Sequence, residues 1–378
     1  SKRNSKSGFM RAIYLDNKIK GAINQLINYF IEGVFDCNNT KVIFKYYKES
    51  FLYYKRQLKK YKINHEYFFS VNKLDMSSYK VVFYLFNAQS NCRILTYRNA
   101  KHIFITHGES NKLASIKPII RIYDYVVCAG DAGVSRYLEN GIFSRYDVEN
   151  HRIIKMGDTF IGKSVFKKIS DKKNAYILYA PTWEGGIKSE QYSSLSEDLY
   201  AFKTIQKYAQ KSDIKKIIIQ AHPNTGHRDK KYRKYLNQGI KFLKSYNLEV
   251  ENMGIYNHKT SFLNKFFLKR SSKDIYPIYQ AFVDISAMEI QLLNEYIPTF
   301  IFINKTKNAI VDKQILKDYY AKIAIQSDAV KVENFEGLEQ IKNFYIGYSF
   351  DELKIMPKNK RVDWLVDFVS KESYGNKI

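Results

Sequence analysis

The alternation of short apolar segments with amphipathic ones is the feature that most limits which fold this 378-residue chain can adopt. Most of the apolar segments have the length and composition of buried strands. They are Arg11–Leu15, Lys41–Tyr46, Val81–Phe86, His102–Thr106, Tyr125–Cys128, His151–Met156, Ala175–Tyr179, Lys216–Gln220, Ala281–Ile285 and Thr299–Ile303. Many of the stretches between them have the 3.6-residue periodicity of helices, and this alternation predicts an α/β fold with parallel sheets.

The apolar segments form two series, separated by the Lys- and Ser-rich segment 163–174. A chain of this length also has room for about two domains. We therefore expect an N-terminal Rossmann-like domain in residues 1–165 and a C-terminal one in residues 166–350. We expect residues 351–378 to form a helix that packs back toward the N-terminal domain.

The charge of the chain predicts an anionic partner. The 62 Lys and Arg residues against 37 Asp and Glu give 62 − 37 = +25, and residues 1–170 hold 29 − 13 = +16 of this excess. Nucleic acid, a membrane face and a phosphorylated ligand all fit such a charge. The segment Lys45–Lys62 carries seven basic residues and one acidic residue, which fits a solvated helix face or contact with an anionic surface.

The cysteine residues and the apolar runs indicate the cellular compartment of the protein. Cys37, Cys92 and Cys128 are far apart and odd in number, which argues against a disulfide framework and favours a reducing compartment. No apolar run reaches the roughly 18–20 residues that span a bilayer, and no signal peptide is evident. The apolar face of Ile19–Phe35 fits packing on a sheet or lying at a membrane surface. We expect a cytoplasmic protein.

The first candidate site follows the segment His102–Thr106. His107 and Gly108 end this expected strand at the carboxyl edge of a parallel sheet, where α/β folds bind ligands. His107 is a candidate general base because its pKa lies near neutrality. Glu109 is a candidate for orienting it, and Lys112 for meeting a phosphate. The alternative is a structural histidine at a strand end.

Two further strand ends carry polar turns. Thr182 and the amides near Gly185 are candidates for phosphate contact, and Trp183 for shaping the pocket; a packed Trp beside a loop is the alternative. His222 precedes Pro223 and an expected helix from about Arg228 to Tyr246, whose N-terminus suits a diphosphate. The pair His222 and His227 lacks the partners of a zinc site.

The fourth turn follows Ala281–Ile285. Ser286 is expected at a helix N-terminus, where a hydroxyl and free amides hold a phosphate, with Glu289 and Gln291 within reach of ribose hydroxyls. The alternative is a capping box in which Ser286 and Glu289 bond each other's backbone amides. No Walker loop, GxGxxG or metal-bridging Asp-x-Asp pair occurs, so we predict no obligatory cofactor and no protein-bound metal, with Mg²⁺ at most stimulatory.

Taken together, these motifs resemble the CDP-glycerol glycerophosphotransferase family, the teichoic acid primases and polymerases and their capsule relatives. The resemblance spans about residues 80–305 in the expected order. The matching runs are His107-Gly-Glu-Ser-Asn-Lys112, Lys117-Pro118, Arg121-Ile-Tyr-Asp124, Tyr179-Ala-Pro-Thr-Trp183-Glu-Gly, His222-Pro223, Thr225-Gly226, Arg228-Asp229 and Asp284-x-Ser286.

This resemblance implies a GT-B glycosyltransferase-like fold, with an acceptor domain, a CDP-donor domain and a cleft between them. His107 then matches the family's acceptor-activating histidine, with Glu109 beside it. His222 matches the histidine at the donor phosphates, and Ser286 a serine at the diphosphate. We assign the remaining positions to two sides. The donor-side residues are Thr182, Trp183, Gly185, Asn224, Arg228, Ala287, Glu289 and Gln291, and the acceptor-side residues are Gly108, Ser110 and Lys112.

The sequence departs from the family pattern at two positions. The family's second serine is Ala287 here, and its downstream acidic residue aligns near Gln291, with Glu289 as a possible substitute. No long N-terminal extension of the polymerases is present in these residues, which favours a priming or single-addition enzyme.

The resemblance implies transfer of glycerol phosphate from CDP-glycerol to an anionic saccharide or lipid-linked acceptor, with release of CMP. The protein is then expected at the inner face of the cytoplasmic membrane, held through its basic N-terminal region. A GT-B glycosyltransferase that uses a CMP- or UDP-sugar is the alternative. A nucleic-acid-binding protein is a distant one, because it leaves the four turns unexplained.

Overall fold

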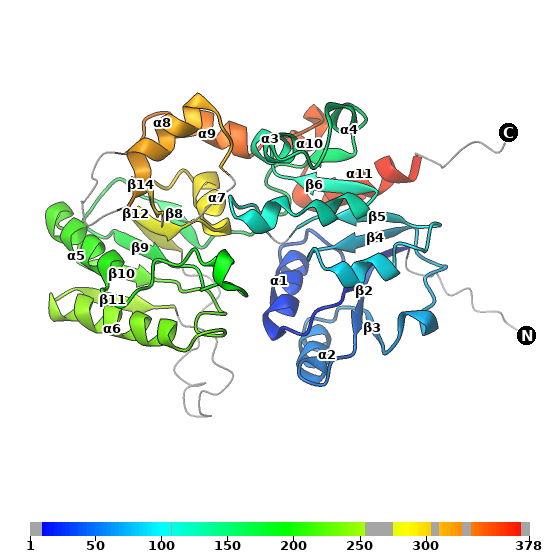
Figure 1. Cartoon of the computed structure of the whole chain (residues 1–378), viewed down its shortest axis with the longest axis horizontal. Coiled ribbons are helices and arrows are strands. Elements are labelled where there is room, and N and C mark those ends of the chain that lie inside the picture. Colours follow the sequence, from blue (N-terminus) through cyan, green and yellow to red (C-terminus); the bar gives the residue numbers. More distant parts are fainter. Residues whose placement is uncertain (1–9, 107, 254–274, 304–309, 327–333, 372–378) are drawn as a thin grey trace, which may run out of the picture. The chain divides into compact units, whose positions relative to one another are not determined.

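Two parallel sheets organise the chain, and each belongs to its own compact unit (Figure 1). The computed structural model describes residues 10–106, 108–253, 275–303, 310–326 and 334–371. The first unit comprises Ser1–Glu109, Ile116–Gly162 and Phe344–Ile378, and the second comprises Ser110–Ser115 and Lys163–Asn343. The units therefore change over at 162/163 and 343/344, close to the domain limits expected at 165 and 350, and residues 110–115 belong to the second unit.

The first sheet has the strand order β3-β2-β1-β4-β5-β6-β7, and all its pairs are parallel. Its strands are β1 (Arg11–Leu15), β2 (Thr40–Lys45), β3 (His65–Phe68), β4 (Val81–Tyr84), β5 (Lys101–Phe104), β6 (Tyr125–Cys128) and β7 (Ile153–Lys155). Its helices are α1 (Lys20–Ile31), α2 (Phe51–Lys60), α3 (Asp131–Glu139), α4 (Arg145–Glu149), α10 (Asp351–Ile355) and α11 (Lys358–Lys371).

Both faces of the first sheet are buried, as in other doubly covered parallel sheets. Alternate residues of β1 enter different cores: Ile13 packs with α1, α2 and α11, whereas Tyr14 lies on the opposite face with residues of α3. Val362, Leu365 and Val369 place α11 in the core of this unit, although more than 200 residues separate α11 from β7. The C-terminal helix thus closes one face of the sheet (Figure 1).

The two N-terminal helices, α1 and α2, both contribute buried residues to the core of this unit. Most apolar residues of α1, such as Ile23 and Leu26, are buried in the core, so the apolar face of this helix packs on the sheet, and Ile31 at its end is exposed. Truncating Leu26 to Ala is expected to cost about 2–5 kcal/mol. In α2, Tyr54 and Leu58 are buried and the basic residues lie on the outer side.

The second sheet has the order β11-β10-β9-β12-β13-β14, with β8 paired to β12. Its strands are β8 (Phe166–Lys168), β9 (Tyr176–Ala180), β10 (Lys216–Ile219), β11 (Glu249–Asn252), β12 (Tyr276–Asp284), β13 (Thr299–Phe302) and β14 (Ala324–Ile325). Its helices are α5 (Tyr200–Ser212), α6 (Lys231–Ser245), α7 (Ala287–Asn294) and α8 (Gln314–Ile323), and α9 (Leu338–Tyr345) crosses the limit between the units.

The central strands of the second sheet are mostly apolar at their buried positions, with Gln280 and Asp284 of β12 as buried polar exceptions. Leu178, Ile218 and Phe282 are all 0% exposed. Among the described residues, no helix is both long enough and apolar enough to cross a membrane.

Candidate functional site

Three neighbouring strands of the second sheet end in polar residues. β10, β9 and β12 lie side by side, and their carboxyl ends lead to His222, Thr182 and Asp284 respectively. The carboxyl ends of adjacent parallel strands meet at one edge of a sheet, which is where α/β folds bind ligands. The candidate site is therefore built from this edge of the second unit.

Asp284 holds the end of β12 against the loop after β9. Its Oδ2 accepts hydrogen bonds from the backbone amides of Thr182 at 2.7 Å and Ser194 at 3.1 Å. The side chain is fully buried, and the loss of solvation raises its pKa to about 7. Its Oδ1 is buried without a hydrogen-bond partner in the described part of the chain. Asp284 thus fixes the turn and keeps one polar atom unsatisfied.

Lys112 lies in the second unit beside Thr182. Its Nζ donates a hydrogen bond to Thr182 Oγ1 at 2.9 Å, and burial lowers its pKa to about 8. We had expected Lys112 and Ser110 on the acceptor side, with the first domain. The structure places residues 110–115 in the second unit, where the backbone amide of Leu113 donates to the hydroxyl of Tyr192 at 3.0 Å, and their acceptor-side role stays a prediction. Ser110 contacts Ser115 through their hydroxyls at 3.1 Å.

Glu184 organises the turn that follows β10. Its buried carboxylate accepts hydrogen bonds from the amides of Gly226 and Arg228 at 2.9 Å and of Asp229 at 3.0 Å. We had expected a helix from about Arg228 whose N-terminal amides hold a diphosphate. In the structure α6 begins at Lys231, and these three amides are bound by a protein carboxylate instead. The Arg228 guanidinium also donates to the Glu184 carbonyl oxygen at 2.7 Å.

The rings of Trp183 and His222 stack on one another. Their centroids are 5.7 Å apart and their planes differ by 16°. His222 Nδ1 accepts a hydrogen bond from the amide of Asn224 at 3.1 Å, which places the proton of the neutral ring on Nε2. The adjacent turn requires glycine, because Gly185 has φ +75° and a Cβ there would lie 2.5 Å from the Glu190 carbonyl oxygen. The stacking on Trp183 and the hydrogen bond to Nδ1 thus hold His222 in a fixed orientation.

Ser286 begins α7 without capping it. It occupies the N-cap position, but its side chain makes no cap hydrogen bond, so the capping-box interpretation is wrong. Ser286 is 7% exposed, and its Oγ has no partner among the described residues. A buried hydroxyl without a partner costs free energy. Together with the positive dipole end of α7, this hydroxyl makes an anion-binding arrangement.

Glu289 takes part in a buried hydrogen-bond chain. Its Oε1 accepts a hydrogen bond from the Tyr320 hydroxyl, which in turn accepts one from Asn111 Nδ2 at 2.8 Å. This chain joins α7, α8 and the segment 110–115, and it occupies one oxygen of the carboxylate that we had expected at ribose hydroxyls. Ala287 is the first residue of α7, and Gln291 lies half-buried one turn later. Their roles stay predictions.

The His-Gly turn belongs to the first unit, and His107 itself lies outside the described residues. The flanking backbone is unusual: Thr106 has φ +60° and Gly108 has φ +147°. A β-branched residue at positive φ is strained, which is common at functional turns. Glu109 accepts a hydrogen bond from the Ala129 amide at 2.8 Å and pairs with the buried Arg136 at 2.5 Å. Arg136, which sequence reasoning missed, therefore fixes the Glu109 carboxylate.

The second unit thus brings together Lys112, Thr182, Asp284 and, at the same sheet edge, Ser286 and His222. An ammonium group, a buried hydroxyl and a helix N-terminus suit a phosphate group without a protein-bound cation. In the described residues, no three His, Cys, Asp or Glu side chains are grouped to hold a metal ion.

Comparisons with known proteins bear on the fold. No protein-family profile and no curated protein sequence matches this chain. Among solved structures, a candidate UDP-N-acetylglucosamine 2-epimerase from Listeria monocytogenes matches with a TM-score of 0.52 and 8% identity, over 97% of this chain and 98% of that one. Anabaena HepE in complex with UDP and glucose matches with 0.48 and 12%, over 95% and 99%. The wall teichoic acid polymerase TagF matches with 0.46 and 13%, over 97% and 90%.

At 8% identity, the epimerase match describes the fold alone. The predicted fold class is confirmed: two parallel seven-stranded sheets with their helices form two Rossmann-like domains of the GT-B glycosyltransferase type.

Proposed function

We propose that this chain transfers glycerol phosphate from CDP-glycerol to a hydroxyl of a membrane-associated saccharide and releases CMP. The observation that carries the proposal is the buried Ser286 hydroxyl, which has no partner within the described residues and lies at the N-terminus of α7. Such a group is costly in the empty protein and is satisfied when a phosphate oxygen accepts its hydrogen bond.

The order of motifs supports the choice of donor. A strand-end His-Gly, a Thr-Trp-Glu-Gly turn, a His-Pro turn and Asp284-x-Ser286 occur in the sequence in the order of the CDP-glycerol glycerophosphotransferases. Three of these turns follow β9, β10 and β12, which are neighbours in one sheet. This arrangement favours a single nucleotide site over three unrelated structural turns.

The proposed reaction is a phosphoryl transfer. The acceptor hydroxyl attacks the β-phosphorus of CDP-glycerol, an O–P bond forms, and the bond from that phosphorus to the bridging oxygen breaks, so that CMP leaves. His107 takes the hydroxyl proton. Ser286, Lys112 and the oriented His222 stabilise the charge on the phosphate oxygens, because such transfers depend mainly on positioning and electrostatics. No cofactor is needed in this scheme, and Mg²⁺ is expected only to stimulate.

The basic helix α2 supports a location at the inner face of the cytoplasmic membrane. Arg56, Lys59 and Lys60 are exposed on it, and anionic lipids attract such groups by about 1 kcal/mol each. The acceptor would be presented on that surface.

One observation favours a second candidate, a glycosyltransferase that uses a CMP- or UDP-sugar. One oxygen of Glu289 is bound by the Tyr320 hydroxyl, so Glu289 is a poor substitute for the acidic residue that the glycerophosphotransferases carry downstream of the serine. The buried anion site would serve either donor.

Mass spectrometry of products distinguishes the two. The protein is incubated with CDP-glycerol, CDP-ribitol, CMP-sugars or UDP-sugars and a panel of neutral and acidic saccharide acceptors, with the Ser286→Ala variant as control. An acceptor gain of one glycerol phosphate, with CMP released, supports the proposal. A gain of one sugar from another donor supports the alternative, and no turnover of CDP-glycerol with any acceptor contradicts the proposal.

A further inference from the structure

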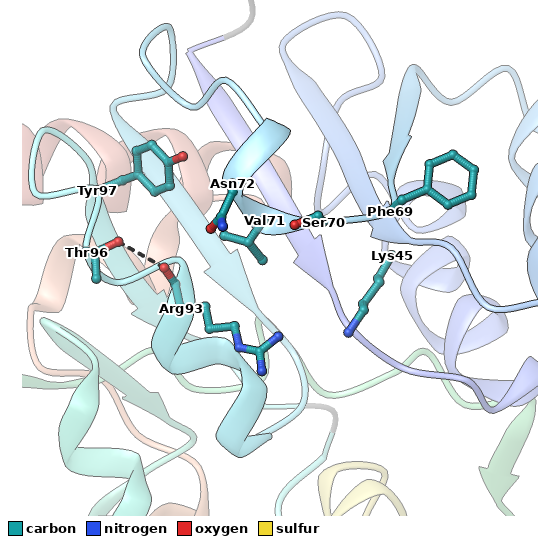
Figure 2. Close-up of a pocket in the computed structure, with 8 residues that line it drawn as sticks. All are labelled: Lys45, Phe69, Ser70, Val71, Asn72, Arg93, Thr96 and Tyr97. Atoms are coloured by element: carbon teal, nitrogen blue, oxygen red, sulfur yellow. Dashed lines mark hydrogen bonds between the residues drawn. The ribbon is translucent and has the colours of Figure 1, made fainter.

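The first unit contains a cavity that none of the motifs predicted. It has a volume of about 550 Å³, within the range of small-molecule sites. Lys45 at the end of β2, Phe69, Ser70 and Asn72 after β3, and Arg93 and Tyr97 after β4 contribute to its lining (Figure 2). The cavity therefore lies at the carboxyl edge of the first sheet, the ligand-binding edge of such a fold.

The two basic residues of the cavity differ in how they are paired. Lys45 Nζ lies 3.7 Å from Asp16, whose side chain is 2% exposed and also accepts a hydrogen bond from the Tyr47 hydroxyl at 2.5 Å. The charge of Lys45 is thus offset. The Arg93 guanidinium makes no ion pair or hydrogen bond with any side chain in the described part of the chain. Arg93 therefore gives the cavity a positive charge without a direct ion-pair partner in the described part of the chain.

The rest of the lining suits a sugar ring better than a bare anion. Phe69 is 66% exposed, and its ring packs against Tyr46 with centroids 4.7 Å apart. The Tyr97 hydroxyl donates to the Leu74 carbonyl oxygen at 2.9 Å, which holds that side chain in place. Ser70 and Asn72 are exposed and offer hydroxyl and amide groups. Aromatic surface with a few polar groups is the usual composition of such a pocket.

We propose that this cavity binds a sugar unit that carries an anionic group, either a carboxylate or a phosphate. The Arg93 guanidinium pairs with two oxygens of the anion, the fork geometry for which arginine is suited. The Phe69 ring covers the apolar side of the sugar, and Ser70 and Asn72 bond its hydroxyl groups. In combination with the proposed function, on which this inference rests, the bound unit is part of the saccharide acceptor.

Direct binding measurements test the proposal without any reaction. Methyl glucuronide and glucose 6-phosphate represent the two anions, and methyl glucoside and inorganic phosphate represent the sugar and the anion alone. We expect calorimetry or ligand-observed NMR to show at least one acidic sugar binding about tenfold or more tightly than both partial probes, and the stronger of the two identifies the anion.

Three variants locate the binding. Arg93→Gln is expected to weaken acidic-sugar binding about tenfold and Phe69→Ala several-fold, because they remove the charge pair and the ring contact. Lys80→Gln, an exposed lysine outside the cavity, is the matched control and should bind within about twofold of the original chain. Arg93 and Phe69 are both exposed, so their variants are expected to fold, and unchanged thermal unfolding verifies this.

The outcomes separate this inference from the proposed function. Unchanged binding in Arg93→Gln and Phe69→Ala, or equal affinity for methyl glucoside and the acidic sugars, overturns the inference even if CDP-glycerol is turned over. Acidic-sugar binding that depends on Arg93, in a protein that does not turn over CDP-glycerol, supports the proposed ligand of the cavity and contradicts only the proposed function.

Discussion

The carboxyl edges of the two sheets differ in how their polar groups are satisfied. In the second unit, Asp284 and Glu184 are buried, and both hold backbone amides of neighbouring loops. In the first unit, the cavity lining includes Ser70, Asn72 and Arg93, which are exposed. The polar groups of the second edge are thus already held in place, whereas those of the first edge are open to solvent; with the proposed function, the second edge suits a small charged group and the first a larger and more variable ligand.

This difference suggests a division of work between the units. A preorganised site suits a group that is the same in every turnover, and in the proposed reaction this group is the diphosphate of the donor. An open cavity suits an acceptor. Thr106, whose backbone is strained at positive φ, belongs to the unit with the open edge, and the proposed function assigns the base to this same unit.

The largest expected effect concerns that proposed base. His107→Ala should lower kcat by about 10²–10⁴-fold, the usual contribution of general acid–base catalysis, and leave the affinity for CDP-glycerol within about twofold. Calorimetry gives the affinity and CMP release gives the rate. His65→Gln, on the edge strand β3, is the control and should change neither. Loss of donor binding in His107→Ala, with the residual chemistry normal, would place His107 in the donor site and break the division between the units.

The next effect concerns the stability of the second unit. Glu184→Ala removes the acceptor of three backbone amides at Gly226, Arg228 and Asp229. Each amide left unpaired costs about 1–3 kcal/mol, and partial exposure of the loop to water reduces the sum. We expect a loss of about 2–4 kcal/mol, and a smaller loss for Glu184→Gln, which keeps one acceptor oxygen.

The two tryptophans allow this loss to be assigned to one unit. Trp183 lies in the second unit and Trp364 in the first, and the chain has no others. In a Trp364→Phe background, urea unfolding followed by fluorescence reports on the second unit alone. Glu197→Ala, an exposed acidic residue of the same unit, should leave this transition unchanged. An unchanged transition in Glu184→Ala as well would show that its buried hydrogen bonds contribute no net stability.

Sequence reasoning succeeded where burial is complete. The central strands of both sheets are largely apolar, so each of them overlaps a predicted segment. It missed β3, β8, β11 and the short β14. The first three are short, and each carries two or three polar residues in the sequences HEYF, FKK and EVEN, since strands at or near a sheet edge need not be apolar.

The candidate site was predicted in part for the same physical reason. Residue types at strand ends could be found, because a polar group directly after a buried strand is visible in the sequence. Their partners could not, because they depend on tertiary contacts. Glu184 meets amides 42 to 45 residues later. Glu289 follows Ser286 at capping-box spacing but bonds Tyr320 instead.

Ser286 offers a smaller effect that separates a ligand contact from a structural one. A capping serine replaced by Ala loses about 1 kcal/mol of stability. Since Ser286 Oγ caps nothing, Ser286→Ala should leave the free energy of unfolding unchanged or slightly increased, and should weaken CDP-glycerol binding about tenfold by removing a hydrogen bond to a charged oxygen.

Ser144 provides the matched control for this prediction. It caps α4 in a true capping box with Asp147, so Ser144→Ala should lose stability and keep donor affinity. A loss of about 1 kcal/mol in Ser286→Ala with unchanged donor binding would mean that the hydroxyl is structural. The contrast between a prepared edge and an open one would then lose its main support.

The smallest expected effect is the pH dependence of donor affinity. The pKa of Lys112 is lowered to about 8, so its ammonium group is mostly charged at pH 7 and mostly neutral at pH 9, whereas an ordinary lysine stays charged over this range. The pKa of Asp284 is raised to about 7, so a negative charge forms near the site as pH rises from 6 to 8. Both changes oppose an anion, and the diphosphate of CDP-glycerol does not itself titrate here.

Donor affinity should therefore fall several-fold between pH 6 and pH 9, when calorimetry is carried out at constant ionic strength. Lys112→Met should bind CDP-glycerol weakly at every pH and lose the part of the change above pH 7.5, because the group that titrates there is gone. Lys188→Met, an exposed lysine of the same unit, should keep the full dependence. An affinity that rises with pH in the unaltered chain would mean that the donor phosphates do not lie near Lys112 and Asp284, and would move the anion site away from this edge of the second sheet.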